Sequence, residues 1–96
     1  MKRVQRKRTK GFRMPENAIY VGRPSKYGNP FKVEREEQRE AAIRMYERHL
    51  RNELIKDPHF LDPLKGKDLA CWCPLHKPCH ADVILKLLKE AEQKNE

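Results

Sequence analysis

The sequence lacks several features that would assign it to a common class of protein. No apolar run approaches the ~20 residues of a membrane-spanning helix, and no apolar stretch follows the basic N-terminus as in a secretory signal. No P-loop, GxGxxG fingerprint or paired-carboxylate motif marks a standard enzyme class. Internal repeats and low-complexity linkers are absent as well. We therefore expect a cytoplasmic protein without a membrane partner, and we leave open whether it is an enzyme.

Acidic residues are scarce in the N-terminal third. Residues 1–32 contain ten Lys or Arg and one acid, Glu16, whereas residues 33–96 contain twelve basic and thirteen acidic residues. The excess of basic over acidic residues that gives the chain its net charge of +8 therefore lies in residues 1–32. A basic segment beside a nearly neutral remainder favours a polyanionic partner, nucleic acid or a nucleotide. The alternative is a solvated tail that only keeps the protein dissolved.

The length of 96 residues predicts one small α/β domain spanning residues 1–96. A core of this size is only marginally sufficient, so a metal, a ligand or a partner could add stability. The sequence predicts no particular oligomeric state.

Apolar and β-branched residues recur in two different periods along the chain. The pattern predicts strands at residues 18–22 and 68–72 and helices at residues 34–56 and 80–93. Residues 1–13 form either a basic arm or an edge strand. This order predicts a two- or three-stranded, mostly parallel sheet with a long crossover helix and a C-terminal helix.

Two polar segments follow the predicted strands. Because parallel strands end at one edge of a sheet, the 22–31 loop and the 71–82 turn should form a composite site. We expect it to bind a phosphate-bearing ligand, a nucleotide or nucleic acid. The residues expected to contact this ligand are Arg6, Arg23, Ser25, Lys26, Tyr27, Asn29, Lys77, Cys79 and His80. Arg3, Lys7 and Arg8 should add non-specific affinity for a nucleic-acid backbone.

Two aromatic residues are candidates for stacking on a base. Tyr27 lies in a loop between Lys26 and Gly28, and we expect it to be the stacking residue. Trp72 is expected to pack against a helix, because a large aromatic residue in a short strand usually belongs to the core.

Three cysteines and two histidines occur within residues 71–80. One interpretation is a zinc site formed by Cys71, Cys73, Cys79 and His80, with His76 as a substitute ligand. The residue types fit zinc, although the spacing departs from that of known fingers and ribbons. Such a chain would be a zinc-stabilised interaction module, with zinc as its only predicted cofactor.

Two other interpretations of this turn stay open. Cys79 lies near the start of the last helix, where the helix dipole favours a thiolate. It could be a nucleophile with His80 or His76 as base and Asp82 as orienting partner, in a small nucleotide- or nucleoside-processing enzyme. Alternatively the thiols are structural, and Cys71 in particular is expected to be a core residue.

Two blocks of the sequence together resemble a family of small, uncharacterised bacterial and phage proteins that share a domain of unknown function. The family has an arginine-containing N-terminal strand, a VGRPxxYGNPF loop and a CxC…PCHADV turn, and this chain contains all three. The pattern falls on Arg6, Gly22, Arg23, Tyr27, Gly28, Asn29, Pro30, Phe31, Cys71, Cys73, Pro78, Cys79, His80 and Asp82. The resemblance covers nearly the whole chain and implies that both loops belong to one site, but it implies no activity.

Overall fold

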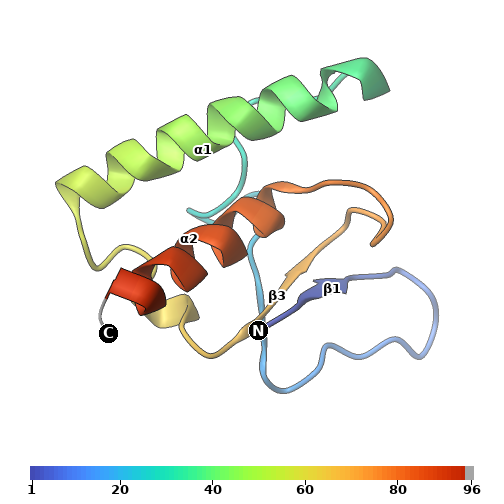
Figure 1. Ribbon diagram of the computed structural model, residues 1–96. Helices are drawn as coiled ribbons and strands as arrows, with labels where there is room; N and C mark the ends of the chain where they lie inside the picture. Colours follow the sequence, from blue (N-terminus) through green and yellow to red (C-terminus); the bar gives the residue numbers. More distant parts are fainter. Residues whose placement is uncertain (95–96) are drawn as a thin grey trace.

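Three short strands and two helices form the fold of the computed structural model, which describes residues 1–94 (Figure 1). The strands are β1 (Arg3–Gln5), β2 (Ala18–Tyr20) and β3 (Asp68–Cys71), and the helices are α1 (Arg39–Lys56) and α2 (His80–Lys94). Short 3-10 turns occupy η1 (Glu36–Gln38) and η2 (Asp62–Leu64). The predicted α/β class, the long helix and the C-terminal helix are confirmed.

The sheet is parallel throughout, in the order β1-β3-β2. Residues 3–5 are therefore an edge strand, which decides between the two alternatives for the N-terminal segment. The central strand β3 pairs with both neighbours, so that Ala70 lies opposite Val4 on one side and Tyr20 on the other. All three strands end at one edge of the sheet, and the chain leaves each strand there.

One face of the sheet packs on the helices. Leu69 and Cys71 of β3 belong to the same buried core as residues of both helices, and α2 contacts both α1 and β3. Helix α1 contributes the buried stripe Ala42, Tyr46 and Leu50, whose spacing follows the helical period. The opposite face carries Ala70 and Tyr20, since successive side chains of a strand alternate. We call the two faces the helix side and the outer side.

The regular elements begin or end a few residues from the predicted positions. Strand β2 ends at Tyr20, because the chain turns after Val21 and the Ser25 N–H donates to the Gly22 carbonyl. Helix α1 begins at Arg39 because residues 36–38 form a 3-10 turn. Among the described residues, neither helix is long and apolar enough to cross a membrane.

Candidate functional site

A small hollow opens at the edge where the three strands end, with a volume of about 260 Å³. The 22–31 loop and the 71–82 turn both line it, so the structure brings these two segments together as expected. Its lining residues are Tyr20, Gly22, Arg23, Asn29, Cys71, Trp72, Cys73 and His80. The hollow lies below the range of roughly 300–1,000 Å³ that is typical of sites for drug-sized ligands. It therefore suits one ring system or one anionic group.

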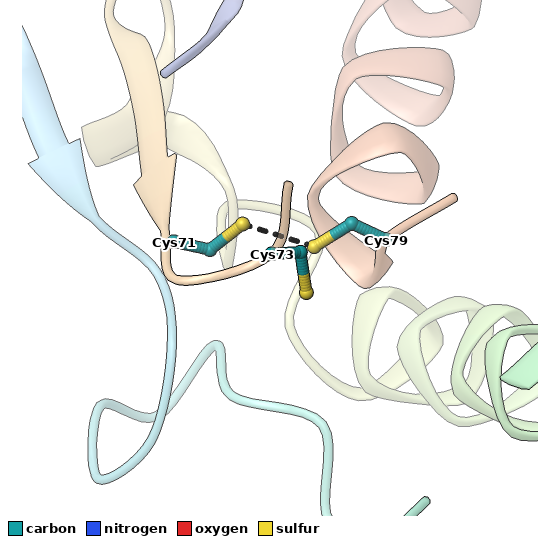
Figure 2. A group of neighbouring side chains, drawn as sticks. All are labelled: Cys71, Cys73 and Cys79. Carbon is teal, nitrogen blue, oxygen red and sulfur yellow. Dashed lines mark hydrogen bonds between the residues drawn. The ribbon is translucent and has the colours of Figure 1, made fainter. Parts of the chain in front are cut away.

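Three thiols converge beside this hollow (Figure 2). Cys71 ends β3, Cys73 follows in the turn and Cys79 directly precedes α2, and their Sγ atoms all lie within 4.8 Å of one another. The Sγ atoms of Cys71 and Cys79 point toward each other at 3.0 Å, beyond the ~2.05 Å of a disulfide. The alternation of the strand carries Cys71 and Cys73 to one side. This cluster could hold a metal ion.

His80 lies against the cysteine cluster with one nitrogen toward a thiol and the other toward the backbone. Its Nε2 is 2.8 Å from the Val21 carbonyl oxygen, and its Nδ1 is 3.4 Å from Cys79 Sγ. A carbonyl can only accept, so Nε2 carries the proton. Burial lowers the pKa of His80, which keeps the ring neutral. The Nδ1 lone pair therefore faces the thiols.

The thiols share their protons unequally. Hydrogen bonds from Cys71 and Cys79 hold the pKa of the Cys73 thiol well below its usual range, with Arg39 adding to the effect. Hydrogen bonding within the cluster raises the pKa of Cys71 and of Cys79. Cys73 is less buried than the other two thiols and lies beside Arg39, so it is the thiol best placed to carry a negative charge.

Arg39 is a charged residue on the core stripe of α1, and the sequence interpretation passed over it. It occupies the position one turn before Ala42 and two turns before Tyr46. Its Nη1 lies 3.7 Å from Cys73 Sγ and 3.4 Å from the Pro78 carbonyl oxygen. An arginine on an otherwise apolar stripe was the signal that could have identified it. Arg39 places a positive charge beside the thiols.

Arg3 anchors the cysteine turn from β1. Its Nη1 pairs with Asp82 Oδ2 at 2.9 Å, and its Nη2 donates to the Pro74 and Leu75 carbonyls at 3.1 and 2.7 Å. The side chain is only 8% exposed. Asp82 Oδ2 also accepts the Cys79 N–H at 3.0 Å. We expected Arg3 to add backbone affinity and Asp82 to orient a catalytic base, but these contacts hold the start of α2 in place.

Tyr27, which we expected to be available for stacking, is buried, and Trp72, which we expected in the core, is partly exposed. Tyr27 is only 6% exposed, packs on Phe60 and donates its hydroxyl hydrogen to the Phe60 carbonyl at 3.0 Å. The Tyr46 hydroxyl donates to the Tyr27 carbonyl, which fixes the loop on α1. Trp72 is 38% exposed and lines the hollow. Among these two residues, the exposed aromatic surface at the site therefore belongs to Trp72.

Other predicted ligand residues lie away from the hollow or are already bonded. Lys26 lies over the Tyr27 and Phe60 rings, and Lys77 pairs with Glu36. The Ser25 hydroxyl is buried without a hydrogen-bond partner among the described residues.

Asn29, a predicted ligand-binding residue, lies at the hollow, whereas His76, the predicted substitute metal ligand, does not. Asn29 lines the hollow, but its amide donates to the Ala42 carbonyl and its Oδ1 accepts the Phe31 N–H. His76, the substitute ligand, is exposed in the turn and lies outside the group of thiols.

Arg6, Arg8 and Arg23 are the predicted cations that remain at this edge, and Arg8 lies over the Trp72 ring. Arg23 is exposed and lines the hollow, and its carbonyl accepts the Tyr20 hydroxyl at 2.6 Å. The Arg6 guanidinium lies 4.9 Å from the ring centroids of both Tyr20 and Trp72. The edge of the sheet thus combines a thiol cluster, these three arginines and a partly exposed indole.

Comparison with models of protein families assigns the chain to a family. Residues 4–90 match the model of a family described as a domain of unknown function, DUF4326. The chain belongs to this family. Searches of the curated proteins and of the solved structures find no match. The family description names no ligand, so the chemistry of the DUF4326 site is argued from its residues.

Proposed function

We propose that this DUF4326 domain holds a zinc ion through Cys71, Cys73, Cys79 and His80, and that the zinc centre shapes a binding site for a phosphate-bearing ligand. The observation that carries the proposal is the convergence of three thiols from the end of β3, the following turn and the start of α2. Cysteine thiolates are the usual ligands of structural zinc, and three of them at one site leave one position for a fourth ligand. The zinc would act as a structural clamp on this edge.

The donor set fits zinc in kind and in spacing. Sulfurs bound tetrahedrally to one zinc lie about 3.8 Å apart, given Zn–S distances of about 2.3 Å. Cys71 Sγ and Cys79 Sγ are 3.0 Å apart and all three sulfurs lie within 4.8 Å of one another, which is compatible with that spacing. Thiolate with imidazole is the ligand combination of structural zinc sites. The three sulfurs are already grouped, whereas His80 Nδ1, which is 3.4 Å from Cys79 Sγ, lies outside the group and must move toward the other two thiols to complete the set.

His80 is suited to be the fourth ligand. Metal-binding histidines usually donate their second ring N–H to a carbonyl or carboxylate, and Val21 accepts that bond here. Val21 directly precedes Gly22 and Arg23, which line the hollow. Metal binding at Nδ1 would therefore fix the start of the 22–31 loop. Arg39 supports the assignment, because three thiolates exceed the charge of Zn²⁺ by one and its guanidinium lies beside Cys73.

The zinc assignment is tested on protein purified without a chelator. Elemental analysis should find one zinc per chain, and chelation should lower the unfolding temperature. His80→Ala should weaken zinc retention, whereas His76→Ala, an exposed histidine of the same turn, should retain zinc fully. Metal-free protein whose melting does not respond to chelator would contradict the proposal.

The phosphate-bearing ligand is supported by a separate observation. Arg23 lines the hollow, and Arg6 lies over Tyr20 and Trp72, two of its lining residues. The first 32 residues of the chain carry ten basic side chains and one acidic one. The negative charges of nucleotides and nucleic acids are complementary to these basic residues. The affinity of the protein for them should fall steeply as salt is added. Titration with a fluorescent oligonucleotide at low and high salt measures this. Binding that is absent at low salt would overturn the ligand assignment and leave the zinc assignment standing.

The enzyme alternative has weaker support. Cys79 is 1% exposed, and hydrogen bonding with Cys71 raises the pKa of its thiol. Attack on a substrate needs an accessible thiolate. The Asp82 carboxylate, which would orient the base, is bonded to Arg3 and to the Cys79 N–H. The geometry therefore favours a metal ligand over a nucleophile at Cys79.

A further inference from the structure

Two arginines and two aromatic rings form one cluster on the outer side of the sheet, which we call the Trp72 cluster: Arg6, Arg8, Tyr20 and Trp72. The guanidinium groups of Arg6 and Arg8 each lie 4.9 Å from the Trp72 ring centroid. The Tyr20 ring meets the indole edge to face, with centroids 6.5 Å apart. Both guanidinium groups lie over the Trp72 ring, so a base that stacks on the indole takes the place of one of them, and the displaced guanidinium is then free to pair with a phosphate.

The register of the sheet explains why these residues meet. Val4, Ala70 and Tyr20 are aligned across the three strands and share the outer side. Arg6 and Trp72 each follow two residues later, and the Arg6 N–H continues the ladder by donating to the Cys71 carbonyl at 2.7 Å. The same alternation directs Cys71 to the helix side. The zinc ligands and the Trp72 cluster are therefore interleaved along one chain segment.

We infer that the Trp72 cluster binds single-stranded nucleic acid, with one unpaired base stacked on Trp72 and flanking phosphates paired with Arg6, Arg8 and Arg23. This inference rests on the proposed phosphate-bearing ligand and names its class. Stacking on an exposed aromatic ring beside cations is how proteins bind single strands without reading their sequence. Arg23 and Trp72 line the same hollow, so one strand can reach both.

The size of the site favours a single strand over a free nucleotide or a duplex. The hollow of about 260 Å³ accepts one base and leaves the sugar and phosphates on the basic rim. A free mononucleotide would use that hollow but carries its phosphates on one side of the base, whereas a strand offers a phosphate on each side. A duplex would offer phosphates, yet its base faces are already stacked within the helix and are closed to Trp72. An unpaired strand satisfies both the ring and the cations.

Trp72 is the only tryptophan of the chain, so intrinsic fluorescence reports directly on this site. Zinc-loaded protein is titrated with four probes: an oligo-dT strand, an oligo-rU strand, an abasic strand of equal length and a duplex. We expect the two base-bearing strands to quench Trp72 and to bind about 10-fold more tightly than the abasic strand. Equal affinity for the abasic strand would overturn the stacking inference and keep the phosphate-bearing ligand. Equal quenching by the duplex would also overturn it.

Variants separate stacking from charge. Trp72→Ala should weaken binding of oligo-dT, measured with a labelled strand, by about 10-fold, and Trp72→Phe should restore part of that loss. Arg8→Ala should reduce the slope of log affinity against log salt by about 0.7, whereas Arg48→Ala, an exposed arginine on α1, should leave it unchanged. Circular dichroism verifies that each variant is folded. Unchanged affinity in folded Trp72→Ala would contradict the inference, and failure of every polyanion to bind would overturn the phosphate-bearing ligand as well.

Discussion

On the helix side of β3, Cys71 is buried with Cys79 and His80 in a neutral, hydrogen-bonded setting, whereas on the outer side Trp72 is exposed between two guanidinium groups. Only one peptide bond separates Cys71 from Trp72. The difference arises because the alternation of β3 continues to Trp72, the residue after its end, so that the two neighbouring side chains enter unlike environments. One short segment can therefore supply a closed metal site and an open binding surface.

The two sides of β3 should contribute to different free energies, that of folding on the helix side and that of ligand binding on the outer side. Thiols and imidazole on the helix side act through bonds that hold three chain segments together, so their loss should appear as lost stability. Arginines and aromatic rings on the outer side act through exposed contacts, so their loss should appear as lost affinity. Variants on the two sides should consequently differ in which measurement they change.

The largest effect is expected from Cys79→Ser on the helix side. Serine is a poor zinc ligand, and structural zinc sites contribute several kcal/mol to folding. We expect a fall in unfolding temperature of roughly 15 °C or more for a chain of this size. Thermal unfolding followed by circular dichroism measures it, with and without added zinc. A shift of only a few degrees, equal in zinc-loaded and zinc-free protein, would remove the reason to distinguish the two sides.

Arg3→Ala tests whether the helix side depends on its anchor at β1. The substitution leaves Asp82 without its guanidinium and frees the Pro74 and Leu75 carbonyls. Because Arg3 is nearly buried but Asp82 is half exposed, we expect a cost of about 2 kcal/mol, below that of a fully buried pair. Urea denaturation measures the free energy of unfolding. Arg13→Ala, an exposed arginine of the 6–17 segment, is the matched control and should cost little.

Gly22→Ala should disturb both sides moderately, since Gly22 joins β2 to the hollow. A Cβ at this position would lie 2.5 Å from the Tyr20 hydroxyl oxygen and 2.7 Å from its Cζ. We expect a loss of about 1–2 kcal/mol from this crowding, together with a change in Trp72 fluorescence as Tyr20 moves. Chemical denaturation and emission spectra measure the two effects. In a Tyr20→Leu background the added methyl group should cost less, and equal costs in both backgrounds would refute the clash.

Glu47→Gln provides the smallest effect and a baseline away from both sides. Hydrogen bonds from Lys86, then Arg51, lower the pKa of Glu47 below its ordinary value of 4.5. A lowered folded-state pKa means that the ion pairs stabilise the protein above pH 4.5 and lose this contribution as pH falls through the folded-state value. We expect a difference between wild type and variant below about 1 kcal/mol at pH 7 that vanishes in acid. Denaturation at several pH values measures it, and a difference that grows toward low pH would reverse the sign.

Local sequence patterns predicted the helices and strands well, because the spacing of apolar residues that marks each of them is set by residues close together in the sequence. The same patterns predicted that the 22–31 loop and the 71–82 turn would meet, since parallel strands end at one edge. They could not predict which side chains turn inward. Tyr27 is buried through Phe60, which lies 33 residues further along the chain. Arg39 reaches the cysteine turn across 34 residues and Arg3 across 72.

Trp72 shows the limit most clearly. Its residue type favours the core, and only the register of β1 against β3 reveals that Arg6 and Arg8 meet the indole on the outer side. Register depends on pairing between strands more than sixty residues apart, which no local pattern contains. The shared cysteine site was one of three interpretations of the turn, and the structure brings its three thiols together, since three cysteines in nine residues have few positions available to them.

Native mass spectrometry of the chain, purified without chelator, tests the central claim most directly. The account predicts a mass equal to the chain plus one zinc, and a zinc-free mass for Cys79→Ser under the same conditions. A metal-free wild-type chain, or one lighter by two hydrogens through a Cys71–Cys79 disulfide, would contradict it.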